Sequence, residues 1–127
     1  MYENGKIYMG LAGDKRVELA LNMCNRHGLI AGASGTGKTV TMKVMAESFS
    51  DAGVPVFLCD VKGDVAGICA PGQSSEGMEK RIDKFGLRDR FVYQGYPTTF
   101  WDVYQEGGHA VRATVSDMGP ELLSRIL

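Results

Sequence analysis

The chain carries, at positions 32–39, the sequence Gly32-Ala33-Ser34-Gly35-Thr36-Gly37-Lys38-Thr39. This stretch fits the pattern G-x-x-x-x-G-K-[ST], which is the P-loop or Walker A motif. The short apolar run 28–31 precedes it and is expected to be a strand. After the motif the period changes to that of a helix, with apolar residues at i, i+3, i+4 and i+7: Met42, Met45, Ala46 and Phe49. Gly53 is placed to end this helix, so strand, glycine loop and helix follow in the order that the motif requires.

The residue types of this loop suit the binding of a nucleoside triphosphate. Glycines let the backbone wrap closely around phosphate oxygens and adopt positive φ, and the following helix adds the partial positive charge of its N-terminus. Lys38 is expected to reach the β- and γ-phosphates, and the Thr39 hydroxyl is expected to ligate Mg²⁺. We therefore predict that residues 32–39, with Val40 at the start of the helix, bind the phosphates of ATP with Mg²⁺, and that Lys38 is the catalytic residue.

Asp60 is a second candidate site residue, because it ends the nearly continuous apolar run 54–59. Such a run is expected to be a parallel strand buried on both faces. An acidic residue at the end of that strand would hold the Mg²⁺ through water or contact the P-loop, and the alternative is that it caps the following turn. The next residue is Val61, where a catalytic glutamate would often stand. The sequence leaves both roles of Asp60 open.

The remaining segments predict an α/β fold with no internal domain boundary, because no repeat, charge block or linker divides the chain. A half-buried strand is expected near the beginning, over 17–23, and a helix through Met78 and Ile82 that stops at Gly86. Further strands are expected at 91–93, 100–104 and 111–115. Another helix is expected to start at Gly119-Pro120. We expect the aromatic residues around Trp101 to lie in the core rather than to stack on bases.

Composition excludes several classes of protein. The 127 residues are 44% hydrophobic and 23% charged, which is typical of a globular domain. A net charge of −1 gives no basic field for nucleic acid as a bulk property. No apolar run approaches the ~20 residues of a membrane helix, and no signal peptide is recognised, so we expect a cytoplasmic protein without a membrane partner. Three scattered cysteines predict neither a zinc site nor a disulfide framework.

Three blocks of the chain resemble the bacterial HerA-like ATPases, relatives of FtsK-type DNA pumps: residues 25–39, 54–64 and 111–120. The Arg-His-Gly lead-in to the P-loop and the Asp-Val-Lys-Gly-Asp block are the most specific, and the resemblance covers about residues 10 to 127. It implies a RecA-like three-layer parallel sheet, an additional catalytic glutamate, homo-oligomeric, hexameric rings and ATP-driven movement along double-stranded DNA. Members are several times longer. No apolar strand ending in Asp-Glu, sensor strand or arginine finger is recognised here, so the chain resembles the N-terminal part of one such ATPase domain, with an incomplete sheet.

Two other functions remain open. In a small-molecule P-loop kinase, Asp60 would contact the acceptor, but the arginines that would form a lid are scattered along the chain. A nucleotide-binding module without turnover is the other alternative. A GTPase is disfavoured, because no Asn-Lys-x-Asp string that would recognise guanine occurs. Arg26 and His27 are expected to serve packing and surface charge rather than nucleotide contact.

Overall fold

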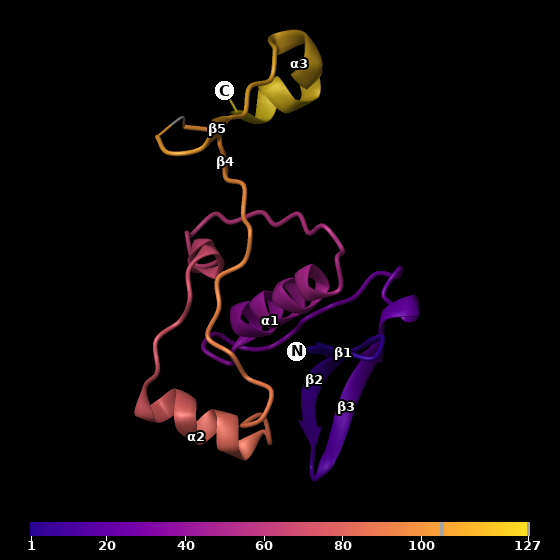
Figure 1. Ribbon diagram of the computed structural model, residues 1–127. Coiled ribbons are helices and arrows are strands. Elements are labelled where there is room, and N and C mark those ends of the chain that lie inside the picture. Colours follow the sequence, from indigo (N-terminus) through magenta and orange to yellow (C-terminus); the bar gives the residue numbers. More distant parts are fainter. Residues whose placement is uncertain (105, 127) are drawn as a thin grey trace. The chain divides into compact units, whose positions relative to one another are not determined.

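The computed structural model describes residues 1–104 and 106–126. The chain divides into two compact units, Met1–Tyr96 and Pro97–Leu127 (Figure 1). The first unit contains an antiparallel sheet and two α-helices, and the second contains a short parallel strand pair and one helix. The chain therefore combines helices with antiparallel and parallel strand pairs, which makes it a small α/β protein.

The first unit begins with a three-stranded antiparallel sheet in the order β1-β2-β3: β1 (Tyr2–Glu3), β2 (Lys6–Ala12) and β3 (Lys15–Ala20). Asn4 and Gly5 have φ of 50° and 75°, which suits the Asn-Gly turn of a two-residue hairpin. Gly13, at φ 62°, opens the second two-residue turn. The strand predicted over 17–23 is confirmed only as far as Ala20, because the chain then enters the short 3-10 helix η1 (Leu21–Met23).

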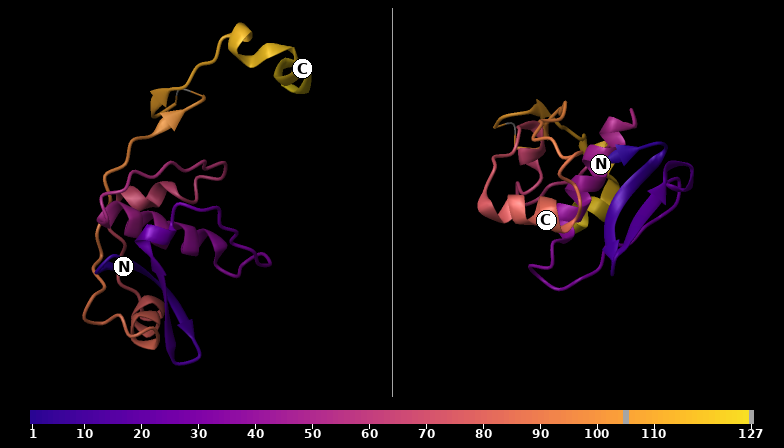
Figure 2. Two further views of the ribbon diagram at one scale, coloured as in Figure 1. Left: turned by 90° about the vertical axis from the view of Figure 1, so that its right-hand side faces the viewer. Right: turned by 60° about the horizontal axis from the view of Figure 1, so that its bottom comes forward.

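The helix predicted after the glycine loop is confirmed as α1 (Lys38–Asp51). It ends where Gly53 adopts a φ of 75°, and the N–H groups of Gly53 and Val54 donate to the carbonyls of Ser50 and Phe49. This left-handed glycine satisfies carbonyls that the helix end would otherwise leave unpaired. Helix α1 lies against β1 and β2 (Figure 2). Its residue Ala46 is buried, as the apolar spacing predicts.

The second predicted helix is also confirmed, as α2 (Glu76–Lys84). Ser75 caps its N-terminus by accepting a hydrogen bond from the Met78 N–H at 3.3 Å, and Gly86 follows its end at φ 61°. The helix contributes Ile82 to a small core with Tyr8 of β2 and with Leu87. The Tyr8 hydroxyl donates to the Phe85 carbonyl at 3.2 Å, so this buried phenol keeps a partner.

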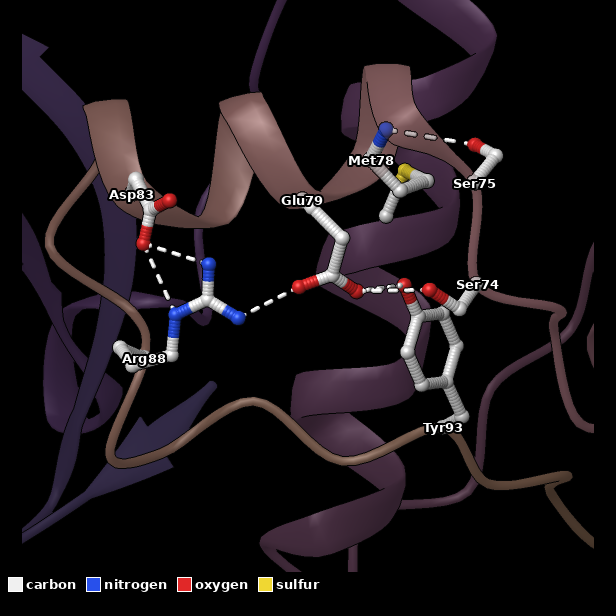
Figure 3. A network of polar contacts seen from close by, with 7 residues as sticks. All are labelled: Ser74, Ser75, Met78, Glu79, Asp83, Arg88 and Tyr93. Atoms are coloured by element: carbon white, nitrogen blue, oxygen red, sulfur yellow. Dashed lines mark hydrogen bonds and ion pairs between the residues drawn. The ribbon is translucent and has the colours of Figure 1, made fainter.

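A network of polar contacts ties α2 to the segments on either side of it (Figure 3). The Glu79 carboxylate accepts hydrogen bonds from the hydroxyls of Ser74 at 2.8 Å and Tyr93 at 3.2 Å, and from the Arg88 guanidinium. Arg88 also pairs with Asp83. These hydrogen bonds, that from Arg88 above all, lower the pKa of Glu79. Arg88 is thereby committed to contacts within its own unit.

The strands predicted at 28–31, 54–59 and 91–93 are absent, since these segments form no ladder with any described residue. Several of their apolar side chains are exposed, Leu29 to 90%, Phe57 to 81% and Val92 to 68%, whereas Phe91 and Tyr93 pack against the small core. A parallel strand requires hydrogen-bonded neighbours and layers that cover both faces of the sheet. The segments form no such ladder in this structure, so the parallel sheet predicted around the P-loop is not confirmed.

The second unit pairs β4 (Trp101–Asp102) with β5 (His109–Ala110) in parallel. The strand expected at 100–104 is confirmed only for two residues, because the Asp102 carboxylate accepts hydrogen bonds from the N–H groups of Tyr104 at 2.7 Å and Gly107 at 3.0 Å and so bends the chain. The prediction of a strand at 111–115 is wrong in position, because the strand of this segment is β5, at 109–110. Of the aromatic residues expected in the core, Trp101 is exposed to 63% and Tyr104 to 85%, whereas Tyr96 is half-buried.

The C-terminal helix α3 (Val115–Ile126) is interrupted at Gly119, which has a φ of 65°. Pro120 therefore starts a helical segment, as predicted, but another short segment precedes it. Thr114 and Asp117 bond reciprocally in front of α3, because the Thr114 hydroxyl accepts from the Asp117 N–H at 3.2 Å and the Asp117 carboxylate accepts from the Thr114 N–H at 3.0 Å. No helix in the described ranges has the length and apolar character needed to cross a membrane.

Candidate functional site

The glycine loop predicted to bind phosphates leads directly into α1. Two of its glycines have the left-handed backbone that only glycine adopts without cost, Gly35 at φ 78° and Gly37 at φ 94°. The loop residues from Gly32 to Thr36 are exposed to solvent. The backbone is therefore folded into a tight, accessible turn at the N-terminus of a long helix.

The N-terminus of α1 presents backbone donors for which the helix has no capping side chain. Gly37 is the N-cap residue and has no side chain to bond them, and the first turn contains no acidic residue. The first hydrogen bond of the helix runs from the Thr41 N–H to the Gly37 carbonyl at 2.9 Å. The N–H groups of Lys38, Thr39 and Val40 consequently have no acceptor within the helix. Together with the helix dipole, they favour an anion at this end.

Lys38 folds back over the loop. Its Nζ donates to the carbonyl of Gly32 at 2.8 Å and to that of Ala33 at 2.7 Å. An ammonium group has three N–H donors, so one remains for another acceptor. The positive charge is thus held at the loop by the loop's own carbonyls.

Thr36 and Gly32 fit closely together inside the loop. The Thr36 hydroxyl donates to the Ala33 carbonyl at 2.8 Å. A Cβ on Gly32 would lie 2.5 Å from that hydroxyl oxygen, so a larger residue at position 32 would displace it. The position of Gly32 in the motif thus has a steric reason here. Sequence reasoning missed the contact of Thr36, although a hydroxyl two residues before the lysine was a visible signal.

Thr39, the predicted Mg²⁺ ligand, is the second residue of α1 and is half-buried, whereas Val40 is largely exposed. The Thr41 hydroxyl bonds to the Gly37 carbonyl at 3.2 Å and so belongs to the helix itself. Among the residues the structure describes, no three His, Cys, Asp or Glu side chains gather where they could hold a metal. A cation here would therefore depend on Thr39 and on oxygens that a ligand brings.

Asp60 organises the turn that follows it. One carboxylate oxygen accepts from the Val65 N–H at 2.8 Å and the Ala66 N–H at 3.2 Å, and the other accepts from the Lys62 N–H at 3.3 Å. These backbone donors, that of Val65 above all, lower the pKa of Asp60. All three hydrogen bonds lie within the turn, so the structure shows the turn-capping role that the sequence left open.

The pKa shift of Asp60 predicts a pH-dependent turn. Because the folded pKa lies below the ordinary value of 3.8, the stabilisation is present above that value and disappears as the pH falls through the folded pKa. We expect the Val65 and Ala66 amides to lose protection from hydrogen exchange on acidification below about pH 4. The Asp60→Ala variant should lose that protection already at neutral pH. Asp64→Asn removes one negative charge from the same turn and should keep the protection. Unchanged protection in Asp60→Ala would contradict this role.

Comparison with known proteins identifies a family. Residues 8–127 match the sequence profile of the family described as Helicase HerA-like C-terminal. Neither a curated protein sequence nor a solved structure matches the chain.

Proposed function

The match covers nearly the whole chain, which therefore belongs to the helicase HerA-like C-terminal family, and we propose from this that it is the ATP-binding portion of a HerA-like ATPase. The observation that carries the proposal is the loop itself, in which the Lys38 ammonium lies against the carbonyls of residues 32 and 33 while the N–H groups at the start of α1 have no partner in the helix. A site of this kind favours a multiply charged anion.

In this proposal each part of the loop has its own task. The backbone of residues 32–37 and the first N–H groups of α1, up to Val40, hold the phosphates. Lys38 stabilises the negative charge that develops on the transferred phosphoryl group, and Thr39 ligates the Mg²⁺, which bridges phosphate oxygens when bound. Asp60 contributes less to Mg²⁺ binding than Thr39, since its oxygens already accept three backbone hydrogen bonds.

We further propose that residues 1–127 are the N-terminal part of one RecA-like ATPase domain. The apolar runs 28–31 and 54–59 are exposed and unpaired here, and a three-layer parallel sheet would supply the neighbours and the cover that they lack. The whole protein would then act in the cytoplasm as a homo-oligomeric, hexameric ring that moves double-stranded DNA. These last features are supported by the family alone.

The kinase alternative gains no support from the geometry. Asp60 would have to leave its own turn to contact an acceptor. Arg88 pairs with Glu79 and Asp83, and Arg90 pairs with Glu3, so neither is available for a lid without breaking these contacts. A nucleotide-binding module without turnover uses the same loop and differs only in catalysis.

Calorimetric titration with a slowly hydrolysed ATP analogue, with and without Mg²⁺, tests the proposal. We expect Mg²⁺ to strengthen binding to the wild-type chain, and Thr39→Ala to reduce that gain by at least about tenfold, as expected for loss of a group that supports a metal. Thr41→Ala removes a hydroxyl one half-turn further along α1 and should retain the gain. Asp60→Asn should lose less of it than Thr39→Ala. A wild-type chain that binds no nucleotide would refute the function.

A further inference from the structure

The Ala33 carbonyl receives more donors than a backbone oxygen in a loop usually does. It accepts from the Thr36 hydroxyl at 2.8 Å and from Lys38 Nζ at 2.7 Å, and the Thr36 N–H lies at 3.4 Å. A carbonyl oxygen has two lone pairs, so the hydroxyl and the ammonium together saturate it. Thr36 and Lys38 therefore meet at one acceptor.

This shared acceptor affects what the loop presents to an anion. Carbonyl oxygens carry partial negative charge and repel phosphate, so a loop that binds phosphate must turn its carbonyls onto other partners and expose its N–H groups. Lys38 covers the Gly32 carbonyl and part of the Ala33 carbonyl. The Thr36 hydroxyl donates to the remaining lone pair of the Ala33 carbonyl. This hydrogen bond restrains the direction of the carbonyl, to which the Lys38 ammonium also donates.

We propose that Thr36 is a positioning residue for Lys38: its hydroxyl fixes the Ala33 carbonyl and thereby holds the lysine ammonium where a triphosphate is bound. This inference rests on the proposed nucleotide-binding function and assigns a side-chain role to a position that the motif leaves variable. The absence of a Cβ at Gly32 is part of the same arrangement, because a methyl group there would lie 2.5 Å from the Thr36 hydroxyl.

The first test compares affinities for the Mg²⁺ complex of a slowly hydrolysed ATP analogue. Thr36→Val keeps the shape and removes the hydroxyl, and we expect it to weaken binding about five- to tenfold, the effect of one hydrogen bond. Thr36→Ser restores the hydroxyl and should bind within about twofold of wild type. Thr41→Val makes the same change at a helical threonine outside the loop and should also stay within about twofold. Circular dichroism confirms that each variant is folded.

The second test needs no nucleotide. Limited acetylation with acetic anhydride, read by mass spectrometry, measures how accessible Lys38 is relative to Lys43 on the same helix. We expect Thr36→Val to accelerate labelling of Lys38 by about fivefold, corresponding to one lost hydrogen bond, with Thr36→Ser near wild type. If the wild-type chain bound no nucleotide, the proposed function would fail, and the labelling rates alone would still decide whether Thr36 holds Lys38.

Three results would overturn the inference. Wild-type labelling of Lys38 in Thr36→Val would show that the hydroxyl does not hold the lysine. Faster labelling of Lys38 with unchanged nucleotide affinity would show that the restraint on Lys38 does not contribute to nucleotide binding. A Thr36→Ser variant as impaired as Thr36→Val would show that the methyl group, rather than the hydroxyl, matters.

Discussion

Lys38→Ala is expected to weaken binding of the Mg²⁺–ATP analogue by about a hundredfold or more, the usual cost of removing one partner from a hydrogen-bonded charge pair. The ammonium lies at the loop, with two N–H donors on the carbonyls of Gly32 and Ala33. Its removal deletes a positive charge from the site and also leaves those two carbonyls facing the phosphates. Repulsion would then replace attraction at the same place.

Lys43→Ala is the matched control for this experiment. It removes the same charge from α1 little more than one turn further on, outside the glycine loop. Calorimetry should give an affinity within about twofold of wild type for this variant, since its partly exposed charge lies outside the loop and is weakened by solvent and salt. If Lys38→Ala bound as tightly as Lys43→Ala, the loop would not be a phosphate site.

The glycine loop and α1 could be predicted from the sequence because their signals are local. Glycines at the motif positions allow the positive φ of Gly35 and Gly37, and apolar residues at helical spacing place Ala46 in the core. The end of the helix at Gly53 follows from the same short-range chemistry. Each of these features depends on residues fewer than two turns apart.

The N-terminal sheet was equally local, yet it was predicted only in part. Asn4-Gly5 is among the strongest hairpin signals in any sequence, and Gly13-Asp14 is a second two-residue turn. A prediction built on the alternation in residues 17–23 alone found β3 and missed its two partners. Attention to turn residues would have found all three strands.

The parallel sheet depends on distant partners, and the role of Asp60 depends on a choice between local partners and a distant site, so the sequence could not settle either. An apolar run such as 54–59 has the composition of a buried strand, but pairing is decided by neighbours far away in the chain. The carboxylate of Asp60 has two competing uses, and the nearby N–H groups of Val65 and Ala66 supply the one that the structure shows. Local donors reach a carboxylate more easily than a distant site does.

A polypeptide of residues 1–127 is expected to bind nucleotide without turning it over. Hydrolysis needs three things: positive charge on the phosphates, a group that orients the attacking water, and often an arginine that meets the charge of the transition state. In the proposed function, the glycine loop supplies the first. The sequence contains no apolar strand ending in Asp-Glu to supply the second, and Arg88 and Arg90 are engaged in ion pairs. An arginine finger alone contributes about 10³–10⁵ in rate.

A steady-state phosphate-release assay on the purified polypeptide, with and without double-stranded DNA, measures this directly. We expect release no faster than that of Lys38→Ala, and no stimulation by DNA, because a net charge of −1 offers no basic surface as a bulk property. Binding of the ATP analogue should persist in the same preparation, which separates missing catalysis from misfolding. A chain extended to include a strand ending in Asp-Glu should gain turnover that Lys38→Ala removes. The opposite result would be turnover of ~1 s⁻¹ by residues 1–127 alone, which is within the ordinary range for enzymes, and its loss in Lys38→Ala. That result would mean that the water-orienting group already lies within residues 1–127.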